Sequence, residues 1–219
     1  MSLAAPYLEK INDQGNTVAA FIGRIPHVPV DHDRDVTILR LQPSHQKTVE
    51  SLGYTWDSLY LAEQVHNSLV NEVIVGETPS VSLASDGLMT ADPGVLLGIY
   101  VADCGAVYIS DTKTRAIALL HSGKKGTEMN IVGKAIEQMA QRYGSRPKDL
   151  LVALAPCIRP PVYEVDFGES IQQQALAAGV PKDQFSDSNT CTSSDLDKYY
   201  SYRVEKGHTG RMLALLGIR

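Results

Sequence analysis

The stretch of sequence that decides the fold is VLLGIYVADCGAVYISDTKTRAIALLHS, residues 95–122. It holds three apolar runs, which extend from Val95 to Ala102, from Ala106 to Ser110 and from Arg115 to His121. Runs of this length without polar alternation are typical of strands that are buried on both faces. Residues 111–114, between the last two runs, have the composition of a turn. The sequence therefore predicts three buried strands, of which the last two are joined by a tight turn.

Other segments supply further strands and a few helices. Strands are predicted from Thr17 to Ile22, Val36 to Leu41, Leu59 to Val65, Val70 to Val75 and Leu150 to Leu154. Helices are predicted from Ser44 to about Leu52, from Ile131 to Tyr143 and from Gln172 to Ala178. Asn67-Ser68 has the place of a hairpin connection, and Thr127 and Gly144 are the expected caps of the middle helix. Many strands without regular strand–helix alternation predict an α+β fold, a single domain with mixed β-sheets flanked by helices.

Composition and charge narrow the class of protein. Of 219 residues, 43% are hydrophobic and 21% are charged, as in soluble globular proteins. The net charge of −5 disfavours general nucleic-acid binding, which depends on excess cations. The longest apolar run, residues 95–102, is far shorter than the roughly 20 residues that span a membrane. The N-terminus lacks a secretory signal, and three widely spaced cysteines suggest no disulfide framework. We therefore expect one cytoplasmic domain over residues 1–219.

A metal site is expected where the predicted strands end. If residues 111–114 form the turn, Cys104 lies directly opposite His121, with Cβ atoms roughly 4.5–5.5 Å apart. A thiolate and an imidazole at that separation can bind one ion, and His66 similarly follows a predicted strand. Three ligands and one open position are typical of a catalytic zinc site, with copper as the alternative metal. A core cysteine with two hydrogen-bonded histidines is the structural alternative.

Several local strings of sequence form an ordered series. In chain order they are Glu63-Gln64-Val65-His66, Ser85-Asp86-Gly87-Leu88-Met89-Thr90, Ala102-Asp103-Cys104-Gly105, His121-Ser122-Gly123 with Gly126-Thr127, Ala155-Pro156-Cys157-Ile158 with Tyr163-Glu164-Val165, and Cys191-Thr192 with Ser201-Tyr202-Arg203 and Gly210-Arg211. This series resembles the YfiH-like family, also called the laccase-domain or multicopper polyphenol oxidase family and now regarded as purine nucleoside phosphorylases. The resemblance covers about residues 63–211, and its specificity comes from the order of the motifs.

The resemblance implies a ligand set and an activity. Family members hold zinc through two histidines and a cysteine, which map onto His66, Cys104 and His121, the residues also indicated by the strand ends. The implied activity is phosphate-dependent cleavage of the glycosidic bond of adenosine, inosine, guanosine and methylthioadenosine, with adenosine deamination as a second reaction. The older laccase label assumed copper, and bacterial relatives have been linked to editing of peptidoglycan precursors. The expected partners are a small nucleoside and phosphate, with no nucleic acid and no membrane.

The chain departs from the family pattern in three places. Lys124-Lys125 stand where members usually have Trp-Arg. The usual N-terminal elements are not recognisable before Trp56, and the segment between Val165 and Cys191 is shortened. These departures should leave the metal ligands in place. They are expected to affect substrate recognition instead.

Cations near two of these motifs are candidate phosphate ligands. Residues 123–126 lead into the helix that is expected to start near Thr127, where free backbone N–H groups and the positive helix end favour an anion. Lys124 and Lys125 would add charge there, although an ordinary solvated loop is the alternative. Arg203 and Arg211 are further candidates, because a guanidinium fork matches phosphate geometry. Surface arginines are common, so the assignment of these two residues as phosphate ligands depends mainly on the motifs that contain them.

Catalytic roles can be assigned in more than one way. Deamination needs a metal-activated water and a carboxylate that moves protons, for which Asp103 and Glu164 are the candidates. Asp103 is better interpreted as an acid that orients a histidine ligand. A cysteine hydrolase with Cys104 as nucleophile and His121 as base is the alternative enzyme class. A non-catalytic metal-binding relative is a third hypothesis, and six histidines are too few for a classical multicopper oxidase.

Overall fold

The computed structural model describes residues 5–219, whose strands form two mixed β-sheets. The first sheet contains, in spatial order, β1 (Thr17–Ile22), β11 (Met212–Ile218), β6 (Leu96–Val101), β2 (Leu59–Ala62) and β4 (Val81–Ser82). The second contains β10 (Phe185–Asp187), β9 (Leu150–Leu154), β7 (Gly105–Asp111), β8 (Ile117–Ser122), β5 (Gly87–Thr90) and β3 (Val70–Glu72). Parallel and antiparallel pairs occur in both sheets, which confirms the predicted α+β fold with mixed sheets.

Helices cover the outer faces of the sheets. The α-helices are α1 (Glu9–Asn12), α2 (Arg34–Ser51), α3 (Lys124–Glu128), α4 (Ile131–Tyr143) and α5 (Phe167–Ala177). Single 3-10 turns lie at Pro6–Leu8, Trp56–Ser58, Pro147–Asp149, Lys182–Gln184 and Thr192–Ser194. Within residues 5–219, no helix is long and apolar enough to cross a membrane.

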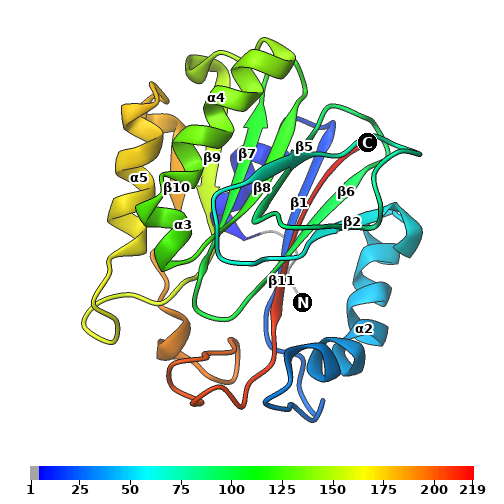
Figure 1. The fold of residues 1–219 in the computed structure, drawn as a ribbon, viewed down its shortest axis with the longest axis vertical. Helices are drawn as coiled ribbons and strands as arrows, with labels where there is room; N and C mark the ends of the chain where they lie inside the picture. The colour runs from blue at the N-terminus through cyan, green and yellow to red at the C-terminus, as the bar shows by residue number, and fades with distance from the viewer. Residues whose placement is uncertain (1–4) are drawn as a thin grey trace.

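The layers follow from the alternation of side chains along the central strands. Leu97, Tyr108 and Leu119 point between the sheets and share one core cluster. Their neighbours Val107 and Leu120 point outward and pack with residues of α4 and α5, whereas Leu96 packs toward α2. Figure 1 shows α4 and α5 on one side of the sheets and α2 on the other. Every residue of β6, β7 and β8 is buried, which confirms that the apolar runs are strands covered on both faces.

The register of the β7–β8 hairpin differs from the predicted one. Ala106, rather than Cys104, lies opposite His121, and Ser110 pairs with Ile117. The turn is longer than predicted because the Asp111 carboxylate accepts the backbone N–H groups of Lys113 and Thr114, 2.7 and 3.1 Å away. The register shift is two residues, and a shift of two keeps each side chain on its face of the sheet. Cys104 therefore still lies near His121, diagonally and just before β7 begins.

The prediction of a strand from Val36 to Leu41 is wrong, because this segment is the first half of α2. Asp33 caps the helix by accepting the backbone N–H groups of Asp35 and Val36. Burial recurs every four residues at Thr37, Leu41, His45 and Val49, which is a helical period. The helix predicted from Ser44 is the second half of the same element, and it continues through Pro43.

The predicted hairpin at Asn67-Ser68 is also wrong, because β2 and β3 belong to different sheets. Residues 63–69 cross from one sheet to the other. Other elements agree more closely: β1, β9 and α4 have the predicted bounds, and Gly144 ends α4 in a left-handed conformation. Thr127 is not the cap of α4, since Asn130 caps it, and α5 starts at Phe167, before the predicted helix start.

Candidate functional site

A cavity of about 700 Å³ opens where strands of the two sheets end. Its lining residues come from the ends of β6 and β8, from the segments after β2 and β6, from the first turns of α2, α3 and α5, and from the loops before α5 and β11. The lining includes Arg34, Gln64, His66, Tyr100, Asp103, Cys104, His121, Lys124, Tyr163, Phe167, Tyr202, Arg203, Lys206 and Arg211. The cavity is therefore built from segments that are distant in sequence.

His66, Cys104 and His121 meet at this cavity, as predicted. One ligand atom of each lies within 4.8 Å of the other two. The two imidazole rings are 4.9 Å apart between centroids and nearly perpendicular. His121 is buried in β8, Cys104 is half-buried before β7, and His66 is exposed on the crossing segment after β2. These positions leave one side of the group open to the cavity.

Several residues in and around this group have an uncommon backbone conformation or lie unusually close to a neighbouring side chain. Gln64, His66 and Asp103 all have positive φ values, of 65°, 61° and 84°. Such values are uncommon outside glycine and tend to occur at functional sites. Gly123 is required for a different reason: a Cβ there would lie 3.0 Å from the Cys104 Sγ and 3.4 Å from His66. The close approach of Gly123 leaves room for the thiol and the ring.

Asp86 is the residue that sequence reasoning missed. It is fully buried, and its Oδ1 lies 2.7 Å from Nδ1 of His121. Its carboxylate also accepts the backbone N–H groups of Val65, His66 and Asn67, at 3.1, 3.0 and 2.7 Å. Burial alone would raise its pKa, but the hydrogen bonds from His121 and from these backbone groups lower it. The string Ser85-Asp86-Gly87 was visible in the motif series, yet nothing local in it indicates this role.

The ionisation of Cys104 and His121 is strongly coupled. Burial would raise the pKa of Cys104, but the charge of His121 and hydrogen bonds from both histidines lower it to about 6. Burial would lower the pKa of His121, but Cys104 and Asp86 raise it to about 9. The sulfur is thus favoured as a thiolate near neutral pH, the form that binds metals and acts as a nucleophile.

Asp103 does not orient a histidine, contrary to the favoured interpretation from sequence. Its carboxylate accepts the hydroxyls of Thr192 (2.5 Å) and Ser201 (3.1 Å) and the backbone N–H of Arg203 (2.7 Å). The side chain is only 7% exposed. Asp103 thus connects the loop before β11 to the segment that carries Cys104. Its carboxylate oxygens are occupied by these three hydrogen bonds.

Of Glu164 and the two predicted lysines, only Lys124 is among the lining residues of the cavity. Glu164 is an exposed rim residue whose carboxylate pairs with Lys124 (3.2 Å) and Arg203 (3.5 Å). Lys124 lines the cavity, whereas Lys125 does not. The predicted anion-binding loop at 123–126 is instead the start of α3, which begins at Lys124 and is only five residues long. Gly123 is the N-cap of this short helix, and no side chain caps the helix end, so anion binding there stays a prediction.

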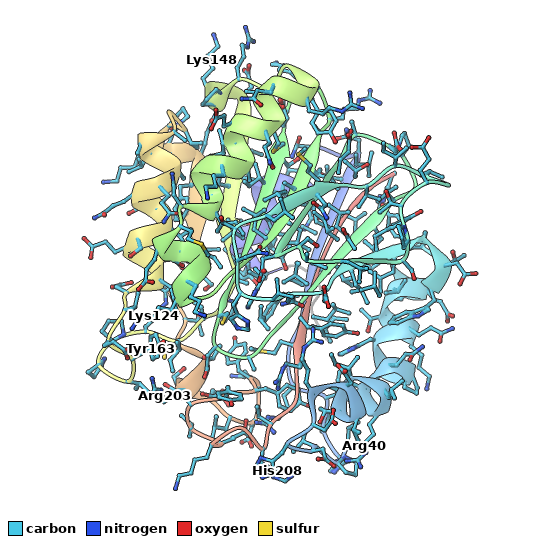
Figure 2. All side chains as sticks on the ribbon, in the orientation of Figure 1. Arg40, Lys124, Lys148, Tyr163, Arg203 and His208 are labelled. Carbon is cyan, nitrogen blue, oxygen red and sulfur yellow. The ribbon has the colours of Figure 1, made fainter. Side chains whose placement is uncertain are left out.

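Arg203 and Arg211, the two arginines predicted to bind phosphate, both line the cavity, but they make different contacts. The Arg203 guanidinium lies over the Tyr163 ring, 4.8 Å from its centroid. Figure 2 shows Lys124, Tyr163 and Arg203 gathered at one end of the molecule. Arg211 is half-buried, and its Nη1 donates to the carbonyls of Thr209 and Gly210. Arg34 of α2 also lines the cavity and was missed, because the residues that follow it, Val36 to Leu41, were predicted to form a strand.

Comparison with solved structures defines the class of fold. The structure resembles YlmD from Geobacillus stearothermophilus with a TM-score of 0.83 and 25% identity, over 98% of this chain and 94% of that one. It also resembles a hypothetical YfiH protein of Bacillus licheniformis with a TM-score of 0.85 and 23% identity, over 96% and 95% of the two chains. The chain therefore has the fold of YfiH- and YlmD-type proteins.

Sequence comparison identifies the family. The family model described as multi-copper polyphenol oxidoreductase laccase matches residues 40–175 and 165–219. The chain belongs to this family, the YfiH-like family that the ordered motifs resemble. Among its relatives is the purine nucleoside phosphorylase YlmD of Geobacillus stearothermophilus, 29% identical over 80% of this chain and 78% of the relative. A purine nucleoside phosphorylase of Deinococcus radiodurans is 31% identical over 77% of this chain and 73% of the relative.

Proposed function

We propose that this protein is a zinc-dependent purine nucleoside phosphorylase that acts on adenosine, inosine, guanosine or methylthioadenosine in the cytoplasm. The observation that carries the proposal is the His66–Cys104–His121 group, which lines a cavity of about 700 Å³. That volume is within the usual range for small-molecule sites. The names of the relatives support the reaction, and the three free cysteines fit a reducing compartment.

The donor set fits zinc. A thiolate and two imidazoles are ligands that zinc accepts, and three protein ligands leave a fourth position for water or substrate. Because Nδ1 of His121 is engaged by Asp86, Nε2 is the nitrogen available to a metal. Copper would accept the same ligands and stays the alternative metal. When bound at an open position, zinc acts as a Lewis acid or lowers the pKa of a bound water.

The chain's own residues have the properties that nucleoside binding requires. Tyr163 and Phe167 stack at 5.5 Å between ring centroids and give the cavity an aromatic wall, where the flat purine would pack. Phosphorolysis replaces the glycosidic C–N bond by a C–O bond to phosphate, while the leaving purine takes up one proton. The cationic lining of the cavity would bind the phosphate and orient it toward the sugar.

The two candidate carboxylates, Asp103 and Glu164, are already bound to other groups, which favours phosphorolysis over adenosine deamination. Deamination would use a free carboxylate to move protons at an activated water. Asp103 is occupied by three donors, and Glu164 is paired with two cations at the rim. Deamination therefore stays a prediction from the family resemblance.

The experiment that tests the proposal is release of hypoxanthine from inosine by zinc-loaded protein, with and without inorganic phosphate. We expect product only when phosphate is present, together with ribose 1-phosphate in equal amount. Hypoxanthine release that does not require phosphate would contradict phosphorolysis and indicate hydrolysis.

A cysteine hydrolase is the second candidate, because the lowered pKa of Cys104 and the adjacent His121 also suit a nucleophile and its base. Treatment with a chelator separates the two candidates. It should abolish a zinc-dependent phosphorylase activity and leave a cysteine hydrolase active.

A further inference from the structure

Two arginines from opposite ends of the chain line the cavity without a carboxylate partner inside it. Arg34 comes from the first turn of α2, and Arg211 immediately precedes β11. Within residues 5–219, no carboxylate oxygen lies within ion-pair distance of the Arg211 guanidinium, which donates only to two backbone carbonyls. The carboxylate paired with Arg34 is that of its neighbour Asp35, which is 83% exposed and does not line the cavity.

Other cations of the same region do have carboxylate partners, although Lys206, which also lines the cavity, has no ion pair among the described residues. Glu164 pairs with both Lys124 and Arg203 at the rim. Arg24, near the loop before β11, pairs with Glu205 at 2.7 Å. Arg34 and Arg211 thus differ from Lys124 and Arg203 in having no carboxylate partner among the described residues that line the cavity, although the nearby Cys104 and Asp103 partly offset the charge of Arg211.

This excess charge has an electrostatic cost that an anion would remove. Burial, and then the nearby charge of Arg34, lower the pKa of Arg211, while Tyr202, Cys104 and Asp103 act in the opposite direction without cancelling this effect, so the two guanidinium groups repel each other. Arg34 also lies at the N-terminal end of an 18-residue helix, where the helix dipole disfavours a cation and favours an anion. An oxyanion between the two groups would be stabilised by both charges.

Arg34 is held in position rather than extended into solvent. Its Nη2 donates to Oε1 of Gln64 at 3.3 Å. The Gln64 amide is in turn fixed to the backbone of Tyr100, donating to its carbonyl at 2.6 Å and accepting its N–H at 3.0 Å. Gln64 lies two residues before His66, so this network connects Arg34 to the metal-ligand candidates.

We propose that Arg34 and Arg211 form the oxyanion subsite of the cavity and bind the phosphate that takes part in the reaction. The identity of the anion rests on the proposed function, whereas the subsite itself rests on two guanidinium groups that line one cavity and have no carboxylate partner among its described lining residues. Phosphate thereby binds near Gln64, the hydrogen-bond partner of Arg34, whereas Lys124 and Arg203 are paired with Glu164.

The test is calorimetric titration of inorganic phosphate into wild-type protein and into the Arg34→Gln and Arg211→Gln variants, at constant ionic strength. Each variant should raise the dissociation constant for phosphate about tenfold or more, the effect of losing a charged hydrogen-bond donor. Arg40→Gln is the matched control, because Arg40 lies on the same helix, pairs with Asp31 at 3.4 Å and is outside the cavity. Figure 2 shows Arg40 well away from Lys124 and Arg203. Thermal melting checks that each variant is folded.

The outcomes separate the subsite from the reaction. Phosphate binding that weakens in Arg34→Gln but not in Arg40→Gln supports the subsite even if inosine is not cleaved, in which case only the proposed reaction fails. Inosine cleavage with an unchanged KM for phosphate in Arg34→Gln would overturn the subsite and leave the reaction standing. Absence of phosphate binding by the wild type would also overturn it. Arginine-dependent binding of inosine 5′-monophosphate, with no binding of free phosphate, would overturn the assignment to free phosphate.

Discussion

Asp86 and His121 are joined by a 2.7 Å contact between Oδ1 and Nδ1, and both side chains are buried. This contact places the proton of a neutral imidazole on Nδ1 and leaves Nε2 as the coordinating atom. The same carboxylate accepts the backbone N–H of His66 at 3.0 Å. One buried acid therefore positions two of the three metal-ligand candidates, although it is not one of them.

We expect the Asp86→Asn substitution to weaken zinc binding about 10- to 100-fold, the usual effect of removing the acid behind a histidine ligand. The Asn side chain keeps one oxygen acceptor, so the crossing segment 63–69 should stay folded. The measurement is competition for zinc with a chromophoric chelator. Asp57→Asn, at an exposed position, is the control and should bind zinc like the wild type. An unchanged affinity in Asp86→Asn would show that Asp86 does not orient the ligand.

Metal content gives the most direct test of the ligand set. Protein purified without added metal should contain about one zinc per chain by mass spectrometry, and Cys104→Ser should lose it. Cys191→Ser is the control, because Cys191 is also partly buried but lies outside the metal-ligand group. Copper in place of zinc would revise the metal and keep the site. Metal in neither the wild type nor Cys104→Ser would exclude the zinc mechanism and favour cysteine chemistry.

The candidate ligands could be predicted from sequence because strand ends mark them locally. His66, Cys104 and His121 each stand next to an apolar run, and the two-residue error in hairpin register left the last two on the same side. Asp86 could not be found in this way. Its partner His121 lies on another strand, 35 residues further along the chain, and only tertiary structure brings the two together.

The wrong prediction of a strand from Val36 to Leu41 has a physical cause. Val36 to Leu41 is rich in residues with strand propensity. The secondary structure of a segment, however, depends on what its side chains pack against. The four-residue spacing of Thr37, Leu41, His45 and Val49 buries one face on the sheet, and this packing outweighs local propensity. The same error concealed Arg34, since a residue before a strand gives no indication that it reaches a cavity.

Asp103 should be important for stability rather than for proton transfer. Asp103→Ala leaves two hydroxyls and one backbone N–H without their shared acceptor. We expect the free energy of unfolding to fall by about 2–4 kcal/mol, since several hydrogen bonds to a charged group are lost. Urea denaturation measures this change, and Asp195→Ala, at a surface ion pair, is the control that should change the free energy of unfolding much less. Loss of activity with unchanged stability in Asp103→Ala would instead identify a proton carrier.

His45 makes stability depend on pH. Its ring is fully buried in α2 against Tyr100, and neither nitrogen has a hydrogen-bond partner among the described residues. Burial lowers its pKa to about 4, whereas the unfolded chain has the ordinary value of 6.5. The unfolded state therefore binds the proton more tightly, and the stabilising effect of the neutral ring is complete above pH 6.5. It declines as the pH falls from 6.5 toward 4, by up to about 3 kcal/mol.

The measurement that checks this is the free energy of unfolding in urea between pH 8 and pH 4, for the wild type and for His45→Leu. The leucine variant cannot be protonated, so its stability should fall less steeply over the window from pH 6.5 to pH 4, while other titrating groups affect both proteins equally. Parallel curves for the wild type and His45→Leu would mean that His45 is protonated as easily in the folded as in the unfolded chain. In that case, burial of the unpartnered ring could not account for the loss of stability in acid.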